Sequence, residues 1–139
     1  MKKKILFLCT HNSARSQIAE GLTNHYFSDM WEAKSAGVEE TYVKPWAIEA
    51  MNRDGVDISG HRSKSVDVFR GEQFDVVVTV CDDARESCPF FPGEKTVHHS
   101  FEDPSDVTGD DETRTQAFCN TRDEIKAWLD EFLPAEVTS

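Results

Sequence analysis

One short segment near the start of the chain combines a nucleophile, a cation and a hydroxyl group. The segment reads Cys9-Thr10-His11-Asn12-Ser13-Ala14-Arg15-Ser16 and lies between an apolar run and a helical pattern. Backbone N–H groups at the start of a helix can bind an oxyanion, and Arg15 can hold two of its oxygens. The same positive field would keep Cys9 as a nucleophilic thiolate, to which the Ser16 hydroxyl can donate. The placement predicts a catalytic oxyanion-binding loop rather than a buried structural cysteine.

Two further cysteines follow the most β-branched strand pattern. Cys81 ends that pattern, and Cys88 comes after six intervening residues. In a helix their Cα atoms would lie roughly 10 Å apart, whereas a disulfide needs them within about 7 Å, so bridging them would require the segment to unwind. Taken alone, the pair is also compatible with core positions, or with half of a zinc site completed by His98 and His99. Because adjacent strand residues point to opposite faces, His98 and His99 would not face the same ion, and we expect no metal site. We also expect no cofactor.

Apolar patterns along the chain predict alternating strands and helices. The expected strands are residues 4–8, 32–36, 74–80 and 96–101, and the expected helices are residues 16–27, 45 to about 55, and 113–133, the last ending before Pro134. Continuous apolar runs are typical of strands that are buried on both faces of a parallel sheet. The elements predict an α/β fold: one doubly wound domain over residues 1–139, with a four-stranded parallel sheet flanked by helices.

Three of the candidate side chains come directly after predicted strands. Cys9, Cys81 and Asp103 each follow the carboxyl end of a strand pattern. Open α/β sheets bind ligands in a crevice outside these ends, so we expect the three side chains to meet there. Asp103 precedes Pro104, and this pair is also common in simple turns.

Composition excludes several classes of partner. The chain has 139 residues, with 15 basic and 26 acidic side chains and a formal net charge of −11. This acidity argues against a protein that binds nucleic acid or an anionic membrane through bulk positive charge. The four cysteines are too few for a small secreted disulfide scaffold. The basic start is followed by only four apolar residues, fewer than the roughly seven that a signal peptide needs. We therefore expect a cytoplasmic monomer.

The segment from Ile5 to Gly21, ILFLCTHNSARSQIAEG, resembles the start of the thioredoxin-coupled arsenate reductases. These enzymes share the fold of the low-molecular-weight tyrosine phosphatases. The phosphatases usually have proline after Arg-Ser, whereas this chain has Gln17, as the reductases do. The Asp103-Pro104 pair also matches the reductase pattern, because the phosphatases place their Asp-Pro later and follow it with tyrosine. The resemblance extends to the final helix and implies a low-molecular-weight phosphatase-like fold.

The resemblance implies a three-cysteine relay. Cys9 would attack arsenate held by Arg15 and the rest of the loop, Asp103 would act as general acid, and Cys81 would attack Cys9 to release arsenite. Cys88 would then form a Cys81–Cys88 disulfide in a looped-out segment for reduction by thioredoxin, with a glutaredoxin system as the alternative reductant. Phosphate or sulfate could occupy the same loop.

Two other functions stay open. A tyrosine phosphatase or small phosphomonoesterase would need only Cys9, Arg15 and Asp103, with water resolving the intermediate. An oxyanion or redox sensor would hold a stable Cys81–Cys88 disulfide without turnover. In the reductase relay, Cys119 is expected to be a bystander.

Two departures from relatives bear on the loop. In some relatives a potassium ion is held by residues matching Asn12, Glu20 and Ser35 together with an aspartate, and Lys64 occupies the place of that aspartate here. Our hypothesis is that the Lys64 ammonium replaces the ion and neutralises Glu20. Several relatives also carry an oxidisable cysteine where this chain has Ala14, so the resting protein should be trapped less easily by oxidation.

Overall fold

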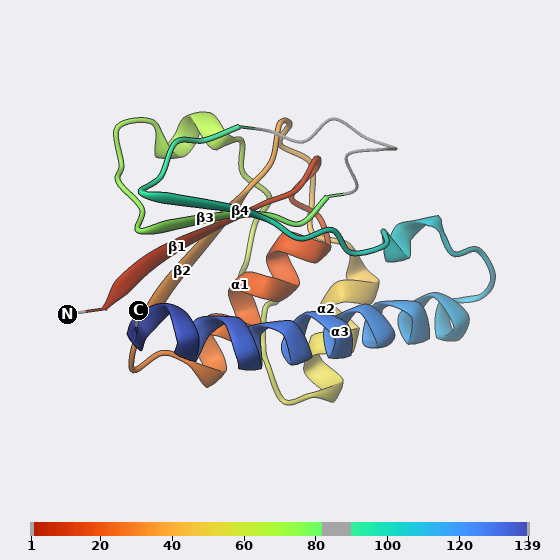
Figure 1. Cartoon of the computed structure of the whole chain (residues 1–139). Helices are drawn as coiled ribbons and strands as arrows, with labels where there is room; N and C mark the ends of the chain where they lie inside the picture. Colours follow the sequence, from red (N-terminus) through yellow and green to blue (C-terminus); the bar gives the residue numbers. More distant parts are fainter. Residues whose placement is uncertain (1, 82–89, 139) are drawn as a thin grey trace.

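The computed structural model describes residues 2–81 and 90–138, and all four expected strands and three expected helices are present in the expected order (Figure 1). The elements are β1 (Lys3–Leu8), α1 (Arg15–Tyr26), β2 (Trp31–Ala36), α2 (Pro45–Arg53), the 3-10 turn η1 (Val66–Phe69), β3 (Val76–Thr79), β4 (Lys95–His98), the 3-10 turn η2 (Pro104–Asp106) and α3 (Asp111–Thr138).

The four strands form one parallel sheet in the order β2-β1-β3-β4. Ile5 in β1 pairs with Ala33 on one side and with Val76 on the other. The chain leaves β1 toward β2 and later returns to place β3 on the opposite side. The gap between the ends of β1 and β3 is therefore the topological switch point, where open α/β sheets bind ligands.

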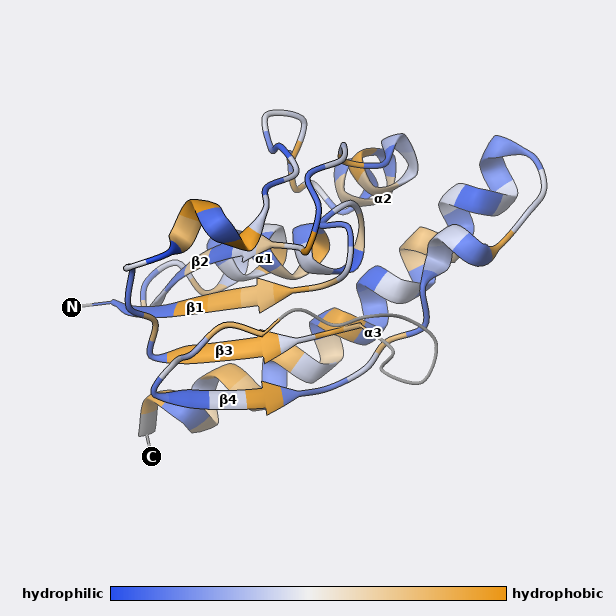
Figure 2. Cartoon of the chain, turned by 90° about the horizontal axis from the view of Figure 1, so that it is seen from above, coloured by the Kyte–Doolittle hydropathy of each residue, from blue (hydrophilic) through white to orange (hydrophobic). Residues whose placement is uncertain are grey.

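Both faces of the central strands β1 and β3 are buried. Helices α1, α2 and α3 lie on one face, and η1 covers the other (Figure 1). Along β1, Ile5 and Phe7 join the core on the helical face, whereas Leu6 and Leu8 join the cluster under η1. Figure 2 shows β1 and β3 as mostly hydrophobic strands, while β4 at the sheet edge begins with hydrophilic residues. Burial on two faces explains the continuous apolar runs in the sequence.

The last helix contradicts the expected boundary at Pro134. Helix α3 begins at Asp111, continues through Pro134 and ends at Thr138. Leu133 is fully buried and Val137 packs against the same core, while the Glu136 carbonyl accepts a hydrogen bond from Lys3 Nζ at 3.2 Å. These contacts on both sides of Pro134 stabilise a final turn that proline by itself disfavours.

The fourth strand is shorter than expected, because residues 99–101 lie beyond β4. Their backbone still follows β3, since His99 N donates to Thr79 O at 2.9 Å and Phe101 N donates to Val80 O at 3.2 Å. This path carries the chain toward Asp103 at the carboxyl edge of the sheet. Among the described helices, none is both long enough and apolar enough to cross a membrane.

Candidate active site

The loop between β1 and α1 lies at the switch point of the sheet. Cys9 follows β1 and is 2% exposed, and Arg15, the first residue of α1, is 3% exposed. The loop therefore ends at the N-terminus of a twelve-residue helix, whose macrodipole favours an anion. The expected position of the oxyanion loop, between a buried strand and a helix, matches the structure.

The carbonyl groups of the loop are held by donors from surrounding segments. The acceptor and donor atoms are Thr10 O with Val38 N at 2.8 Å, His11 O with Ser63 Oγ at 3.0 Å, Asn12 O with Gln17 Nε2 at 3.2 Å, and Ser13 O with Lys44 N at 2.9 Å. In a trans peptide the C=O and the following N–H point in opposite directions. The N–H groups of residues 11–14 therefore point away from these donors, in the arrangement of an anion-binding nest.

Asn12 and Gly37 fix the turn of the loop. Asn12 has a φ of 50°, in the left-handed region that asparagine tolerates better than most residues. Gly37 lies so close that a Cβ there would be 2.8 Å from the backbone nitrogen of Asn12 and from the carbonyl oxygens of Cys9 and Thr10. The packing role of Gly37 could not be predicted from the sequence, since no local pattern marks a contact 25 residues away.

Ser16 is positioned to donate to the Cys9 sulfur. The Cys9 Sγ and Ser16 Oγ atoms are 2.8 Å apart, and both residues are buried. Asn12 Nδ2 donates to Ser16 Oγ at 2.8 Å and to Ser35 Oγ at 2.9 Å. Because Ser16 Oγ accepts from Asn12, its own proton is available for Cys9. This contact can stabilise a Cys9 thiolate, as the loop pattern predicts.

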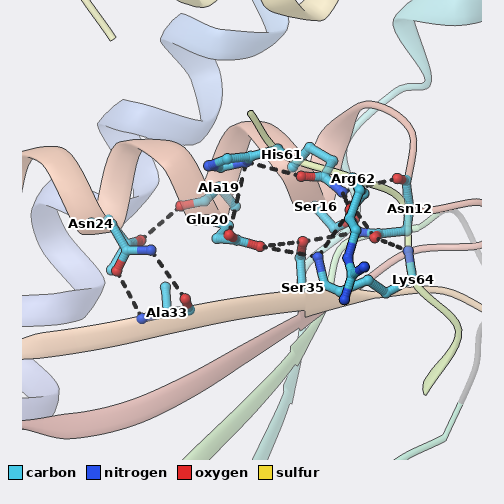
Figure 3. Close-up of polar contacts among 12 residues, drawn as sticks. Asn12, Ser16, Ala19, Glu20, Asn24, Ala33, Ser35, His61, Arg62 and Lys64 are labelled. Carbon is cyan, nitrogen blue, oxygen red and sulfur yellow. Dashed lines mark hydrogen bonds and ion pairs between the residues drawn. The ribbon is translucent and has the colours of Figure 1, made fainter. Parts of the chain in front are cut away.

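The same network extends to Glu20, as Figure 3 shows. Ser35 Oγ donates to Glu20 Oε1 at 2.5 Å, and Lys64 Nζ lies 3.8 Å from that oxygen. His61 Nδ1 lies 3.8 Å from Glu20 Oε2. Burial lowers the pKa of Lys64, although the nearby Glu20 carboxylate partly opposes this effect. Asn12, Ser35 and Glu20 therefore form one hydrogen-bonded network, and the Lys64 ammonium lies beside its carboxylate.

Arg15 and Asp103 lie close together above the loop. Arg15 Nη1 donates to the Phe101 carbonyl at 3.2 Å, and Arg15 Nη2 lies 3.6 Å from Asp103 Oδ2. The other Asp103 oxygen accepts from Ser105 N at 2.9 Å, which holds the carboxyl at the start of η2. Asp103 also lines a pocket together with His11 and Ser13 of the loop. The structure thus brings Asp103 to the loop, as its position after the last strand suggested.

Cys81 also lies at this edge of the sheet. Val80 N donates to Leu8 O at 2.9 Å, so the residues that come next, Cys81 and Cys9, lie at neighbouring positions beyond the ends of β3 and β1. Both cysteines belong to one buried cluster. Cys81 is disulfide-bonded, whereas Cys9 and Cys119 are free. The expectation for Cys88 falls outside the described residues.

The two histidines of the zinc alternative have different neighbours. His98 Nδ1 is 2.6 Å from Thr79 Oγ1, while the His99 ring stacks on Trp128 at a centroid distance of 5.0 Å. Within residues 2–81 and 90–138 no group of three or more His, Cys, Asp or Glu side chains could hold a metal ion.

Comparisons with known proteins agree with this geometry. Residues 4–139 match the family described as low molecular weight phosphotyrosine protein phosphatase. An arsenate reductase of Shouchella clausii is 46% identical over 132 residues, covering 94% of this chain and 95% of the relative. The solved structure of an arsenate reductase in its phosphate-binding state has a TM-score of 0.80 and 29% identity, and the match covers 96% of this chain and 98% of that one.

A third similar protein is described as thioredoxin-dependent. The structure of a thioredoxin-dependent arsenate reductase of Corynebacterium glutamicum has a TM-score of 0.60 and 27% identity, covering 93% of this chain and 62% of that one. The strand order, the loop at the switch point and the match over nearly the whole chain lead to one conclusion: the chain belongs to the low molecular weight phosphotyrosine protein phosphatase family.

Proposed function

We propose that this protein is an arsenate reductase that uses Cys9, Cys81 and Cys88 as a thiol relay. The observation that carries the proposal is the placement of a second buried cysteine, Cys81, at the strand end next to Cys9. Hydrolysis of a phosphate ester needs only one thiol, because water can resolve the intermediate. Reduction of arsenic needs thiols that supply two electrons, so a second cysteine beside the nucleophile favours a reductase.

The first step is attack by the Cys9 thiolate on arsenate. The loop N–H groups and Arg15 hold the oxyanion, and Ser16 stabilises the thiolate through the 2.8 Å contact. A sulfur–arsenic bond forms and one arsenate oxygen leaves as water, with a proton supplied by Asp103. Arg15 Nη2, 3.6 Å from Asp103, aligns this carboxyl above the loop.

The second step transfers the electrons. The Cys81 thiolate attacks the Cys9 sulfur, and the electron pair of the sulfur–arsenic bond passes to arsenic, which leaves as arsenite. The product is a Cys9–Cys81 disulfide. Cys88 then attacks Cys81, which frees Cys9 and leaves a Cys81–Cys88 disulfide. A dithiol must reduce this bond to complete the cycle, and the similarity to a thioredoxin-dependent reductase favours thioredoxin over glutaredoxin.

Replacing Cys88 with serine tests the relay. We expect Cys88→Ser to release about one arsenite per protein and then stop, because a Cys9–Cys81 disulfide accumulates without a resolving thiol. Mass spectrometry of the stopped protein should identify that disulfide. Cys119→Ser is the matched control, since Cys119 lies in α3 and should leave multiple turnovers intact.

Two results would contradict the proposal. Sustained arsenite formation by Cys88→Ser would remove Cys88 from the relay. Rapid hydrolysis of an aryl phosphate by the wild-type protein, with no arsenite formed from arsenate, would identify a phosphatase instead.

A further inference from the structure

A pocket of about 370 Å³ opens above the oxyanion loop. Its described lining comes from three segments: His11 and Ser13 of the loop, Thr41, Tyr42 and Lys44 ahead of α2, and Asp103 and Ser105 at η2. One water takes up about 30 Å³ in the liquid, so the pocket has more room than one tetrahedral oxyanion of five heavy atoms requires. Side chains beyond the loop can therefore contribute to the binding of an anion in this pocket.

Lys44 lines this pocket, and its backbone is tied to the loop. Its backbone N–H donates to Ser13 O at 2.9 Å, which ties residue 44 directly to the loop. Its ammonium lies 5.0 Å from the centroid of the Tyr42 ring, a cation–π distance. Tyr42 is 62% exposed, so its ring and the ammonium beside it are open to solvent.

Lys44 is also the only lysine or arginine in the described lining of the pocket. The other two cations near the loop have carboxylate neighbours, because Arg15 lies beside Asp103 and Lys64 beside Glu20. The ion pairs found among the described residues do not include Lys44.

Local charge decides how an anion reaches this site. The protein has a net charge of −11, and Asp103 lines the same pocket. At physiological ionic strength charges act over about 8 Å, so distant carboxylates matter less than groups inside the pocket. A cation in the same pocket as Asp103 offsets the repulsion that an incoming dianion meets from this carboxylate.

We infer that Lys44, held by Tyr42, is a substrate-binding residue that attracts a doubly charged tetrahedral oxyanion into the pocket. The inference rests on the proposed function for the identity of the substrate. In this role Lys44 attracts the anion as it enters the pocket and while it lies in the loop, so its loss should weaken binding and leave the reaction at Cys9 unchanged.

The test compares Lys44→Gln with a charge-matched control. We expect Lys44→Gln to raise KM for arsenate about 3- to 10-fold with kcat unchanged, the range for loss of one exposed charge interaction with a dianion. The dissociation constant for inorganic phosphate, measured by calorimetry, should rise by a similar factor. Lys44→Arg should restore both values, because it keeps the charge and the ring contact.

Lys126→Gln is the control. It removes the same charge from α3, where Lys126 pairs with Asp130 and lies 4.5 Å from the Tyr26 ring centroid. Tyr26 ends α1 and is roughly 17 Å along the helix from the loop, about two Debye lengths. We expect Lys126→Gln to leave KM and phosphate affinity unchanged.

The possible outcomes separate this inference from the proposed function. Unchanged KM and phosphate affinity in Lys44→Gln, or equal changes in Lys126→Gln, would overturn the inference. A fall in kcat without a change in KM would also overturn it. If the wild-type protein binds phosphate but forms no arsenite, and Lys44→Gln still weakens phosphate binding, the capture site stands and the proposed function fails.

Discussion

Gly37 offers the sharpest test of how the fold holds the oxyanion loop. It follows β2 and contacts the loop so closely that a Cβ would lie 2.8 Å from three backbone atoms of residues 9–12. We predict that Gly37→Ala lowers kcat/KM for arsenate about 10- to 100-fold in a protein that still folds.

The size of this effect follows from the contact distances. Ordinary Cβ contacts begin near 3.4 Å, so each contacting atom would have to move by about 0.6 Å. Gly37 itself cannot retreat, because its N–H donates to Lys64 O and its carbonyl accepts from Val66 N, both at 2.9 Å. The loop must move instead. Catalytic groups tolerate displacements of only about 0.5 Å, and overpacking of this kind costs about 1–3 kcal/mol of stability.

The assay measures steady-state arsenite formation with a thioredoxin system, together with the urea midpoint of each variant. Gly60→Ala is the matched control, since a Cβ at Gly60 would meet no atom within 4 Å. Gly60→Ala should retain wild-type activity and stability. The reasoning is refuted if Gly37→Ala keeps kcat/KM within about twofold of wild type, a difference of less than 0.5 kcal/mol.

Two further predictions concern charge. Because Lys64 Nζ lies 3.8 Å from Glu20 Oε1, we expect arsenate reduction to run at equal rates in potassium and sodium chloride of the same ionic strength, and a clear rise in potassium would contradict the Lys64 hypothesis. Hydrogen bonds from the Thr113 backbone and side chain lower the pKa of Asp110 below its ordinary 3.8. The folded carboxyl therefore binds its proton less tightly than the unfolded one, and its stabilisation is present at neutral pH and lost as the pH falls through the folded pKa. Asp110→Asn should lower the urea midpoint at neutral pH, and the difference from the wild-type protein should shrink below pH 3.8. An equal loss of stability at neutral pH and below pH 3.8 would contradict this prediction.

Much of the fold could be predicted because its signals are local. The apolar run at residues 5–8 and the valine-rich run at residues 76–80 specify buried strands by composition alone. The end of α3 could not be predicted in this way, since Pro134 argues for a stop. The helix continues because Leu133 and Val137 pack against the core, a contact with residues far away in the sequence.

The candidate active site shows the same contrast between local sequence signals and contacts with distant residues. The residue types and spacing from Cys9 to Ser16 predicted an oxyanion loop, because a thiol, a guanidinium and a helix start within eight residues have few other uses. The spacing could not reveal that Val38, Lys44 and Ser63 bind the loop carbonyls. Those donors are brought to the loop by the parallel sheet and the packing of α2, which no local period encodes.

The sequence by itself determined the chemistry available to this protein: the nucleophile, the cation, the additional cysteines and the strand ends that carry them. Only the tertiary structure decided how that chemistry is directed. It turned the loop carbonyls outward, brought Lys64 to Glu20 and placed Lys44 over Tyr42 in the lining of the pocket. The physical reason is the distance along the chain over which each kind of interaction acts. Residue identity and periodicity act within a few positions of the chain, whereas packing and electrostatics act between surfaces that meet only in the folded protein.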